Sequence, residues 1–127
     1  MSESLSILVV DDHPSMASTL ADVLDVKGFE SHAAYSGAEA LEILRNQRVE
    51  ILLTDVRMPD MNGVELYRAT RKTYPNLTTF LMTAYAADDI IQKGMAEGIK
   101  AVLNKPVDID LLLTLFSAHK RIITKAG

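Results

Sequence analysis

Short apolar runs alternate with longer amphipathic segments along this chain, and the alternation limits the folds that are open to it. The runs have the length of β-strands, and the segments between them repeat their apolar residues with helical spacing. The five runs are Leu5–Val10, Glu30–Tyr35, Ile51–Thr54, Thr79–Met82 and Ala101–Leu103. Five strands that alternate with five helices predict an α/β fold, in which a parallel sheet carries helices on both faces.

The segments between the runs also carry signals for where helices begin and end. Ser36 is followed by Glu39, and Asn62 by Glu65, which in both cases is the spacing of a capping box. The five predicted helices are Pro14–Lys27, a segment that begins at Ser36, a segment that follows Asn62 and ends before Pro75, Asp88–Glu97, and a segment that starts after Asp108.

The pattern inside each run predicts its place in the sheet. Four runs are largely apolar, as expected for strands that helices cover on both sides. The run Glu30–Tyr35 alternates polar and apolar residues, which suits an edge strand. In an open sheet of this kind, ligands bind beyond the carboxyl ends of the strands, at the point where the strand order reverses.

Polar side chains stand at the carboxyl ends of four of these five runs. They are Asp11 and Asp12 after the first, Asp55 at the end of the third, Thr83 at the end of the fourth and Lys105 at the end of the fifth. Taken singly, each has an ordinary structural explanation, such as a turn at Asp55 or a helix cap at Asp12. Because the carboxyl ends of parallel strands share one edge of a sheet, we expect all five side chains to converge there.

The chemistry of this set favours a divalent cation and a phosphoryl group. Three neighbouring carboxylates repel one another, and a hard cation such as Mg²⁺ relieves that repulsion while it keeps several water ligands. Lys105 and Thr83 can each bind a phosphoryl oxygen. An Asp among these groups can attack phosphorus and form an aspartyl phosphate. We interpret His13, which follows the acidic pair, as a solvated loop residue.

The composition narrows the class of protein. At 127 residues the chain has the length of one domain with a substantial core. Its net charge of −4 does not favour nucleic-acid binding, and the absence of cysteine excludes disulfides and thiolate metal sites. No segment has the roughly 20 consecutive apolar residues of a membrane span. We therefore expect a cytoplasmic protein that binds neither nucleic acid nor membrane directly.

Five stretches of the sequence together resemble the receiver domain of two-component response regulators. They are VVDDHP (Val9–Pro14), SGAEALEIL (Ser36–Leu44), LLTDVRMPDMNG (Leu52–Gly63), MTAYA (Met82–Ala86) and NKPVD (Asn104–Asp108). The resemblance covers nearly the whole chain, and the motifs follow one another in the order of the family. It implies a flavodoxin-like (βα)5 fold with strand order 2-1-3-4-5. Residues 1–127 would form a single receiver domain, with a core over about residues 5–123.

The resemblance also implies roles for the residues at the strand ends. Asp55 would be the phosphoacceptor, and a sensor histidine kinase or a histidine phosphotransfer protein would be the donor. Mg²⁺ would be held by Asp11, Asp12, Asp55 and the backbone carbonyl of Arg57. Lys105 and Thr83 would contact the phosphoryl oxygens. Such a domain catalyses only its own phosphorylation and dephosphorylation, so we expect no enzyme that acts on a separate substrate.

Other positions would govern the output and the lifetime of the signal. Arg57 and Tyr85 lie two residues after Asp55 and Thr83, at positions that tune dephosphorylation in the family, and both are large enough to impede water. Thr83 and Val102 would form the switch, with Val102 at a place where many members carry an aromatic residue. The switched surface would comprise the fourth helix, fifth strand and fifth helix, and would contact a downstream protein target. The Lys105–Pro106 bond would be cis.

Rival interpretations predict other residues at these positions. A phosphohydrolase of the haloacid dehalogenase type would need a second Asp where Arg57 stands. A nucleotide-binding protein would need a Gly-rich or Ser/Thr-rich loop after the first strand, where this chain has the acidic DDHPSM. A pseudo-receiver, which would act as an interaction module without phosphorylation, would be expected to lose the acidic pair, Asp55 or Lys105.

Family members can form homodimers, but the charge pattern of those dimers is not evident in the fourth and fifth predicted helices.

Overall fold

The computed structural model describes residues 4–126, and the surroundings of side chains for residues 4–119. Ten elements alternate along the chain as predicted. They are β1 (Ser6–Val10), α1 (Pro14–Val26), β2 (Glu30–Ala34), α2 (Gly37–Asn46), β3 (Ile51–Asp55), α3 (Gly63–Thr70), β4 (Thr78–Thr83), α4 (Asp89–Glu97), β5 (Ala101–Asn104) and α5 (Ile109–Ala126). None of the helices within residues 4–126 combines the length and the apolar character that crossing a bilayer requires.

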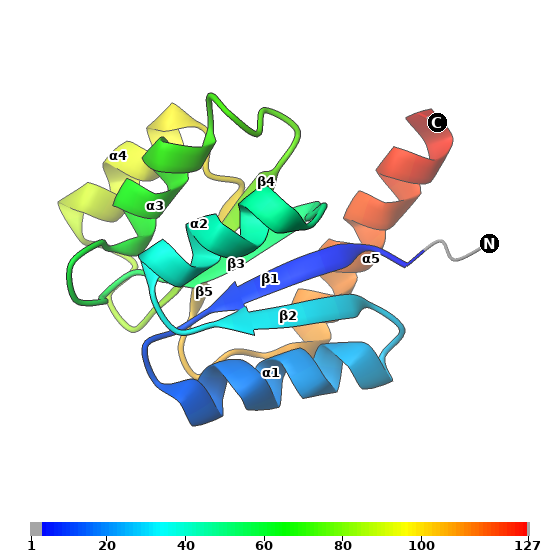
Figure 1. Cartoon of the computed structure of the whole chain (residues 1–127). Coiled ribbons are helices and arrows are strands. Elements are labelled where there is room, and N and C mark those ends of the chain that lie inside the picture. The colour runs from blue at the N-terminus through cyan, green and yellow to red at the C-terminus, as the bar shows by residue number, and fades with distance from the viewer. Residues whose placement is uncertain (1–3, 127) are drawn as a thin grey trace.

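The five strands form one parallel sheet in the order β2-β1-β3-β4-β5 (Figure 1). This order confirms the predicted topology, and it places the polar strand β2 at an edge. The chain first adds β2 on one side of β1 and then places β3 on the other side. The strand order therefore reverses between β1 and β3, and their carboxyl ends open the crevice where ligands bind in folds of this type.

Helices cover both faces of the sheet, with α1 and α5 on one side and α2, α3 and α4 on the other (Figure 1). Alternate side chains of each strand supply the two cores. On the α1 and α5 side, Ile7, Val9 and Phe80 are buried, and Phe116 of α5 packs edge-on against Phe80 with 5.3 Å between ring centroids. On the opposite side, Leu8 and Leu52 belong to the core beneath α2 and α3, and α4 covers a third cluster.

Two element boundaries can be compared with the sequence-based expectation. Asp55 was expected to end the third strand, and it is the last residue of β3, where it pairs in register with Met82. The third helix was expected to end before Pro75, and α3 ends at Thr70. The Tyr67 carbonyl accepts from both the Thr70 hydroxyl and the Arg71 N–H, and Pro75 disfavours helical dihedrals at the residue before it.

The two predicted capping boxes behave differently. At α3 the box is complete, because the Asn62 side chain accepts from Glu65 N–H and the Glu65 side chain accepts from Asn62 N–H. At α2 the Ser36 hydroxyl accepts from Glu39 N–H as expected, but the Glu39 carboxylate accepts from Tyr35 N–H instead of Ser36 N–H. Both helices thus begin with a side-chain cap.

Candidate functional site

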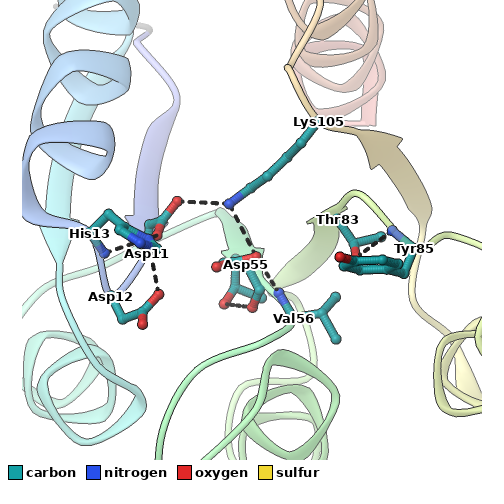
Figure 2. Close-up of polar contacts among 9 residues, drawn as sticks. Asp11, Asp12, His13, Asp55, Val56, Thr83, Tyr85 and Lys105 are labelled. Atoms are coloured by element: carbon teal, nitrogen blue, oxygen red, sulfur yellow. Dashed lines mark hydrogen bonds and ion pairs between the residues drawn. The ribbon is translucent and has the colours of Figure 1, made fainter.

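The polar residues at the strand ends lie together at one edge of the sheet (Figure 2). Asp11 and Asp12 follow β1, Asp55 ends β3 and Thr83 ends β4. Lys105 follows β5, and its side chain extends towards the carboxylates of Asp11 and Asp55 (Figure 2). The sheet brings together all five side chains that the sequence placed at strand ends, at the reversal of strand order.

The sheet and the loop that follows it hold Asp55 in place. Its side chain is buried, and Val56 N–H donates a hydrogen bond of 2.9 Å to Asp55 Oδ1. The loop after β3 returns to the strand end, where Gly63 N–H donates to the Val56 carbonyl at 2.9 Å. A Cβ atom at residue 63 would collide with the carbonyl oxygen of Asp55. Glycine at this position therefore allows the close approach that fixes the strand end.

Lys105 joins two of the three carboxylates. Its ammonium Nζ lies 3.0 Å from Asp11 Oδ2 and 3.2 Å from Asp55 Oδ1. The Lys105 N–H also donates to the Thr83 carbonyl at 2.9 Å, and the following Lys105–Pro106 peptide bond is cis. The Lys105 ammonium thus bridges the ends of β1 and β3, and the loop that carries Lys105 is anchored to β4.

Burial and the local charges shift the pKa values of these groups in different directions. Desolvation raises the pKa of Asp55, and although Lys105 opposes this change, the nearby charge of Asp11 adds to the rise. Desolvation acts on Asp11 too, but the bond from His13 N–H and the Lys105 ammonium outweigh it and lower the Asp11 pKa. Burial would lower the pKa of Lys105, yet its two carboxylate partners raise it. Of these two buried carboxylates, Asp55 is the less stabilised as an anion, which favours its reaction with an electrophile.

The carboxylate oxygens are arranged to suit a divalent cation. One ligand atom from each of Asp11, Asp12, His13 and Asp55 lies within 4.8 Å of the others. Asp12 Oδ1 is buried, and within the described residues it accepts no hydrogen bond. His13 Nδ1 lies 3.4 Å from this oxygen without hydrogen-bond geometry. A buried carboxylate oxygen without a donor, next to two further carboxylates, fits the hard oxygen coordination that Mg²⁺ prefers.

His13 has a local structural role that the sequence did not reveal. Its side chain is 70% exposed, in agreement with the expected loop position, and His13 is the N-cap residue of α1 without capping it through its side chain. Its backbone N–H and its Nδ1 contact Asp11 Oδ1 at 3.0 and 3.2 Å. His13 rather than Asp12 therefore occupies the N-cap position, so Asp12 does not have the capping role considered from the sequence.

Thr83 and Val102 lie on the neighbouring strands β4 and β5. Thr83 is buried at the end of β4, and its Oγ1 accepts a hydrogen bond of 3.0 Å from Tyr85 N–H (Figure 2). Val102 on β5 pairs with Leu81 and packs against the cluster that includes Ile91 of α4. A movement of Thr83 would therefore pull directly on the β4–α4 loop.

Arg57 and Tyr85 contact each other at the exposed rim of the site. The Arg57 guanidinium carbon lies 4.0 Å from the centroid of the Tyr85 ring, and Arg57 Nη2 donates to Asp88 Oδ2 at 2.8 Å. Asp88 was not among the residues singled out from the sequence. It follows Arg57 by 31 positions, and no local motif connects the two.

Comparisons with known proteins agree with this geometry. Residues 7–117 match the family model of the response regulator receiver domain. The chain is 42% identical over 108 residues to a response regulator receiver protein of Anaeromyxobacter sp. (strain Fw109-5), across 85% of this chain and 45% of that protein. It is 37% identical over 115 residues to the sensor protein EvgS of Escherichia coli (strain K12), across 91% of this chain and 10% of that protein.

Solved structures show the same similarity. A crystal structure of a CheY-like response regulator receiver domain protein from Methanospirillum hungatei JF-1 superposes with a TM-score of 0.89. The two sequences are 27% identical, and the match covers 98% of this chain and 99% of that one. The chain spans less than half the length of the two curated relatives described above, but nearly all of this solved domain.

Proposed function

The chain belongs to the response regulator receiver domain family of two-component signalling systems, and we propose that it accepts a phosphoryl group on Asp55 in a Mg²⁺-dependent reaction. The observation that carries the proposal is the buried Asp55 carboxylate between Asp11 and Lys105 at the reversal of strand order. We propose that residues 1–127 act as a single receiver domain in the cytoplasm.

The transfer consists of an attack by a carboxylate oxygen on phosphorus. Both the Val56 N–H and the Lys105 ammonium engage Asp55 Oδ1, so we propose Oδ2 as the attacking atom. The new P–O bond forms as the P–N bond of a donor phosphohistidine breaks, and the bonding electron pair remains on the imidazole nitrogen. The product is an aspartyl phosphate, and the domain acts on no separate substrate.

Residues of this chain would bind the transferred group at three places. Mg²⁺ would be held by Asp11, Asp12, Asp55 and the Arg57 carbonyl, and it would neutralise charge on the phosphoryl oxygens. Lys105 would exchange its contact with Asp55 for a phosphoryl oxygen, since its Nζ already lies at that carboxylate. The Thr83 hydroxyl would donate to another phosphoryl oxygen and draw the β4–α4 loop inwards. The signal would then be read by a downstream protein on the surface of α4, β5 and α5, which includes Val102.

A decisive test of this function is the intact mass of the wild-type chain after exposure to acetyl phosphate with Mg²⁺. A gain of one base-labile phosphoryl group is expected. A pseudo-receiver would gain none and would still bind its partner. The contacts of Lys105 with Asp11 and Asp55, and the position of Asp12 within the same cluster of carboxylates, support phosphorylation over the pseudo-receiver alternative.

The surface beside the site suits the donor protein. A groove of about 420 Å³ runs from Asp11 and Lys105 along α1, where Met16, Leu20 and Val23 line it. The Met16 side chain is 55% exposed, although it is large and apolar. Exposed apolar surface next to a reactive group is typical of a docking site. We propose that the phosphohistidine-bearing helices of the donor pack on this groove and thereby reach Asp55.

Substitution Met16→Glu should slow phosphotransfer from the protein donor about tenfold or more, relative to labelling by acetyl phosphate, which needs no docking surface. Burying a methionine contributes about 1.5–3 kcal/mol, and each 1.4 kcal/mol is a factor of ten in affinity. The measurement compares the two rates, with the donor chosen as the kinase or phosphotransfer protein of the source organism that labels the wild type fastest. Met95→Glu on α4 is the matched control. Equal effects of the two substitutions would place the docking surface elsewhere.

Arg57 and Tyr85 would control how long the phosphoryl group persists. Hydrolysis needs a water molecule in line with phosphorus on the solvent side of the group. The stacked Arg57 and Tyr85 side chains lie at that rim, and Arg57 carries a charge that can bind a phosphoryl oxygen. We propose that both side chains impede the attacking water and give a slowly decaying phosphoprotein.

The variants Tyr85→Ala and Arg57→Ala should each speed phosphate loss, and the double variant should lose phosphate fastest. A hydrogen bond to a charged group contributes about 1.5–3 kcal/mol, so loss of the Arg57 contact should accelerate decay about tenfold or more. Decay of the phosphorylated species by intact mass after removal of the donor measures the rate. Tyr35→Ala, which removes another exposed tyrosine, is the control. Rapid loss in the wild type, or no acceleration in either variant, would show that these residues do not form a barrier.

A further inference from the structure

The ion pair of Arg57 and Asp88 links the loop after β3 to the N-cap residue of α4. Arg57 Nη2 and Asp88 Oδ2 are 2.8 Å apart, and both side chains are substantially exposed. The guanidinium also lies over the ring of Tyr85, whose N–H is bonded to Thr83. One arginine therefore contacts the segment before α4 at two points, while its own backbone lies two residues from Asp55.

Asp88 stands at the N-cap position of α4 but does not cap the helix. Its backbone is extended, with φ −58° and ψ 141°, and its side chain accepts no hydrogen bond from the first turn. Aspartate is among the best N-cap residues, and the first N–H groups of a helix need such an acceptor. The Ser36 and Asn62 side chains cap α2 and α3 of the same fold. At α4, Asp88 Oδ2 instead accepts a hydrogen bond from Arg57 Nη2, so the carboxylate is held by the guanidinium and not by the first turn of the helix.

We propose that Asp88 is a positioning residue that acts through Arg57. In the unphosphorylated protein it holds the guanidinium at the rim, and when Asp55 carries a phosphoryl group, Arg57 turns to that group and Asp88 becomes the N-cap of α4. This inference rests on the proposed phosphorylation of Asp55. It adds a route by which the chemistry at β3 reaches α4 separately from Thr83.

The charges favour this exchange of partners. An exposed ion pair with a single carboxylate is weak and is screened by salt. A phosphoryl group carries a charge of about −1.5 to −2 at pH 7 and offers three acceptor oxygens to an arginine. Two residues of chain span at most about 7 Å, so the Arg57 backbone is close enough for its long side chain to reach a phosphoryl group on Asp55. The released Asp88 carboxylate is then favoured at the positive end of the α4 dipole.

The opposite end of α4 is held in place, which confines the change to the first turn. Glu97 accepts hydrogen bonds from Arg68 and Arg71 of the α3 end, and the Tyr67 hydroxyl donates to the Glu97 carbonyl at 2.7 Å. At Gly98, directly after α4, a side chain would collide with the Tyr67 hydroxyl. The C-terminal end of α4 is thus tied to α3 by contacts that do not involve the phosphorylation site.

Amide hydrogen exchange in the first turn of α4, residues 89–92, tests the proposal. In the wild type, acetyl phosphate with Mg²⁺ should slow exchange there about fivefold, the effect expected of one gained N-cap. Arg57→Ala should show slow exchange before any phosphorylation, because Asp88 is already free to cap. Asp88→Asn keeps a good cap and loses the charge, so it should resemble Arg57→Ala. Asp88→Ala cannot cap, so exchange should stay fast in both states.

A second measurement separates positioning from a purely structural role. Asp88→Asn should slow phosphate loss severalfold, because Arg57 is no longer shared with a carboxylate. The same substitution in the Arg57→Ala background should have no effect on that rate, which is the signature of a residue that acts through its partner. Asp89→Asn is the matched control, since it removes the neighbouring charge of the first turn without touching the pair. Its basal exchange reflects the lost interaction with the helix dipole, so the comparison uses the slowing of exchange on phosphorylation and the rate of phosphate loss, and both should match the wild type.

The possible failures are distinguishable. If the intact mass shows no phosphoryl gain in the wild type, the proposed function fails. Amide hydrogen exchange of residues 89–92 in unphosphorylated Arg57→Ala and Asp88→Asn still tests whether Asp88 can cap α4. If the mass shows the gain but exchange in residues 89–92 does not change, or changes equally in Asp88→Ala, the role of Asp88 is wrong. A slowing of phosphate loss by Asp88→Asn that persists without Arg57 would also overturn it.

Discussion

Substitution Asp55→Asn should abolish the phosphoryl gain from acetyl phosphate and Mg²⁺, while the wild type gains one base-labile group. The amide can still accept the Val56 N–H bond, so the loop is retained, but it lacks the anionic oxygen that attacks phosphorus. Intact mass measures the extent of labelling. Asp60→Asn is the matched control, because Asp60 lies in the same loop, is exposed and has a positive φ of 68° that asparagine tolerates.

The control should label as fully as the wild type. A variant Asp55→Asn that is labelled to the same extent would show that another group is the acceptor. The two remaining carboxylates of the cluster, Asp11 and Asp12, would then be the candidates. Fragment masses of the labelled variant would locate the phosphoryl group, so this outcome would correct the assignment as well as contradict it.

Removal of the metal should have the second-largest effect. With excess chelator, labelling by acetyl phosphate should be nearly lost, and Asp12→Ala should reduce it at saturating donor by at least about 10- to 100-fold. Loss of even an outer-shell partner typically costs about that much in metal affinity, and Asp12 is proposed as a direct ligand. Mg²⁺ titration followed by intact mass measures both effects. Folding should survive, because removing one of three crowded carboxylates relieves repulsion.

The control for this experiment is Asp22→Ala, which removes an exposed carboxylate from α1 away from the cluster. It should leave the Mg²⁺ dependence unchanged. Labelling that continues undiminished in excess chelator would contradict the metal requirement. If Asp12→Ala is labelled to the same extent as the wild type at the same Mg²⁺ concentration, Asp12 alone is removed from the proposed ligands.

Most of the architecture could be predicted because its causes are local. Short, largely apolar runs such as Leu5–Val10 and Ile51–Thr54 bury both faces of a strand, and amphipathic segments of helical length must lie against them. The polar alternation of Glu30–Tyr35 indicated an edge, and β2 is an edge strand. The residues at the strand ends could be placed together for the same reason, since parallel strands point their carboxyl ends to one side.

The boundaries were less predictable, because tertiary contacts decide them. Asp55 reads as a turn residue in the sequence, yet pairing with β4 keeps it within β3. The sequence placed the end of the third helix only before Pro75, and α3 ends at Thr70, with Tyr74 N–H still donating to the Thr70 carbonyl.

The residue types at the site, their order along the chain and the sheet edge at which they meet all follow from the amino-acid sequence. Which of these groups contact one another depends on the packing of the folded chain. Lys105 could have paired with any of three carboxylates, and it lies between Asp11 and Asp55 because the β5–α5 loop is anchored to Thr83. The pair of Arg57 and Asp88 has no signal in the sequence at all. Hydrophobic periodicity and turn chemistry act between residues that are a few positions apart in the chain. A hydrogen bond or ion pair instead forms over a few ångströms, here between segments that are brought together only when the sheet is packed.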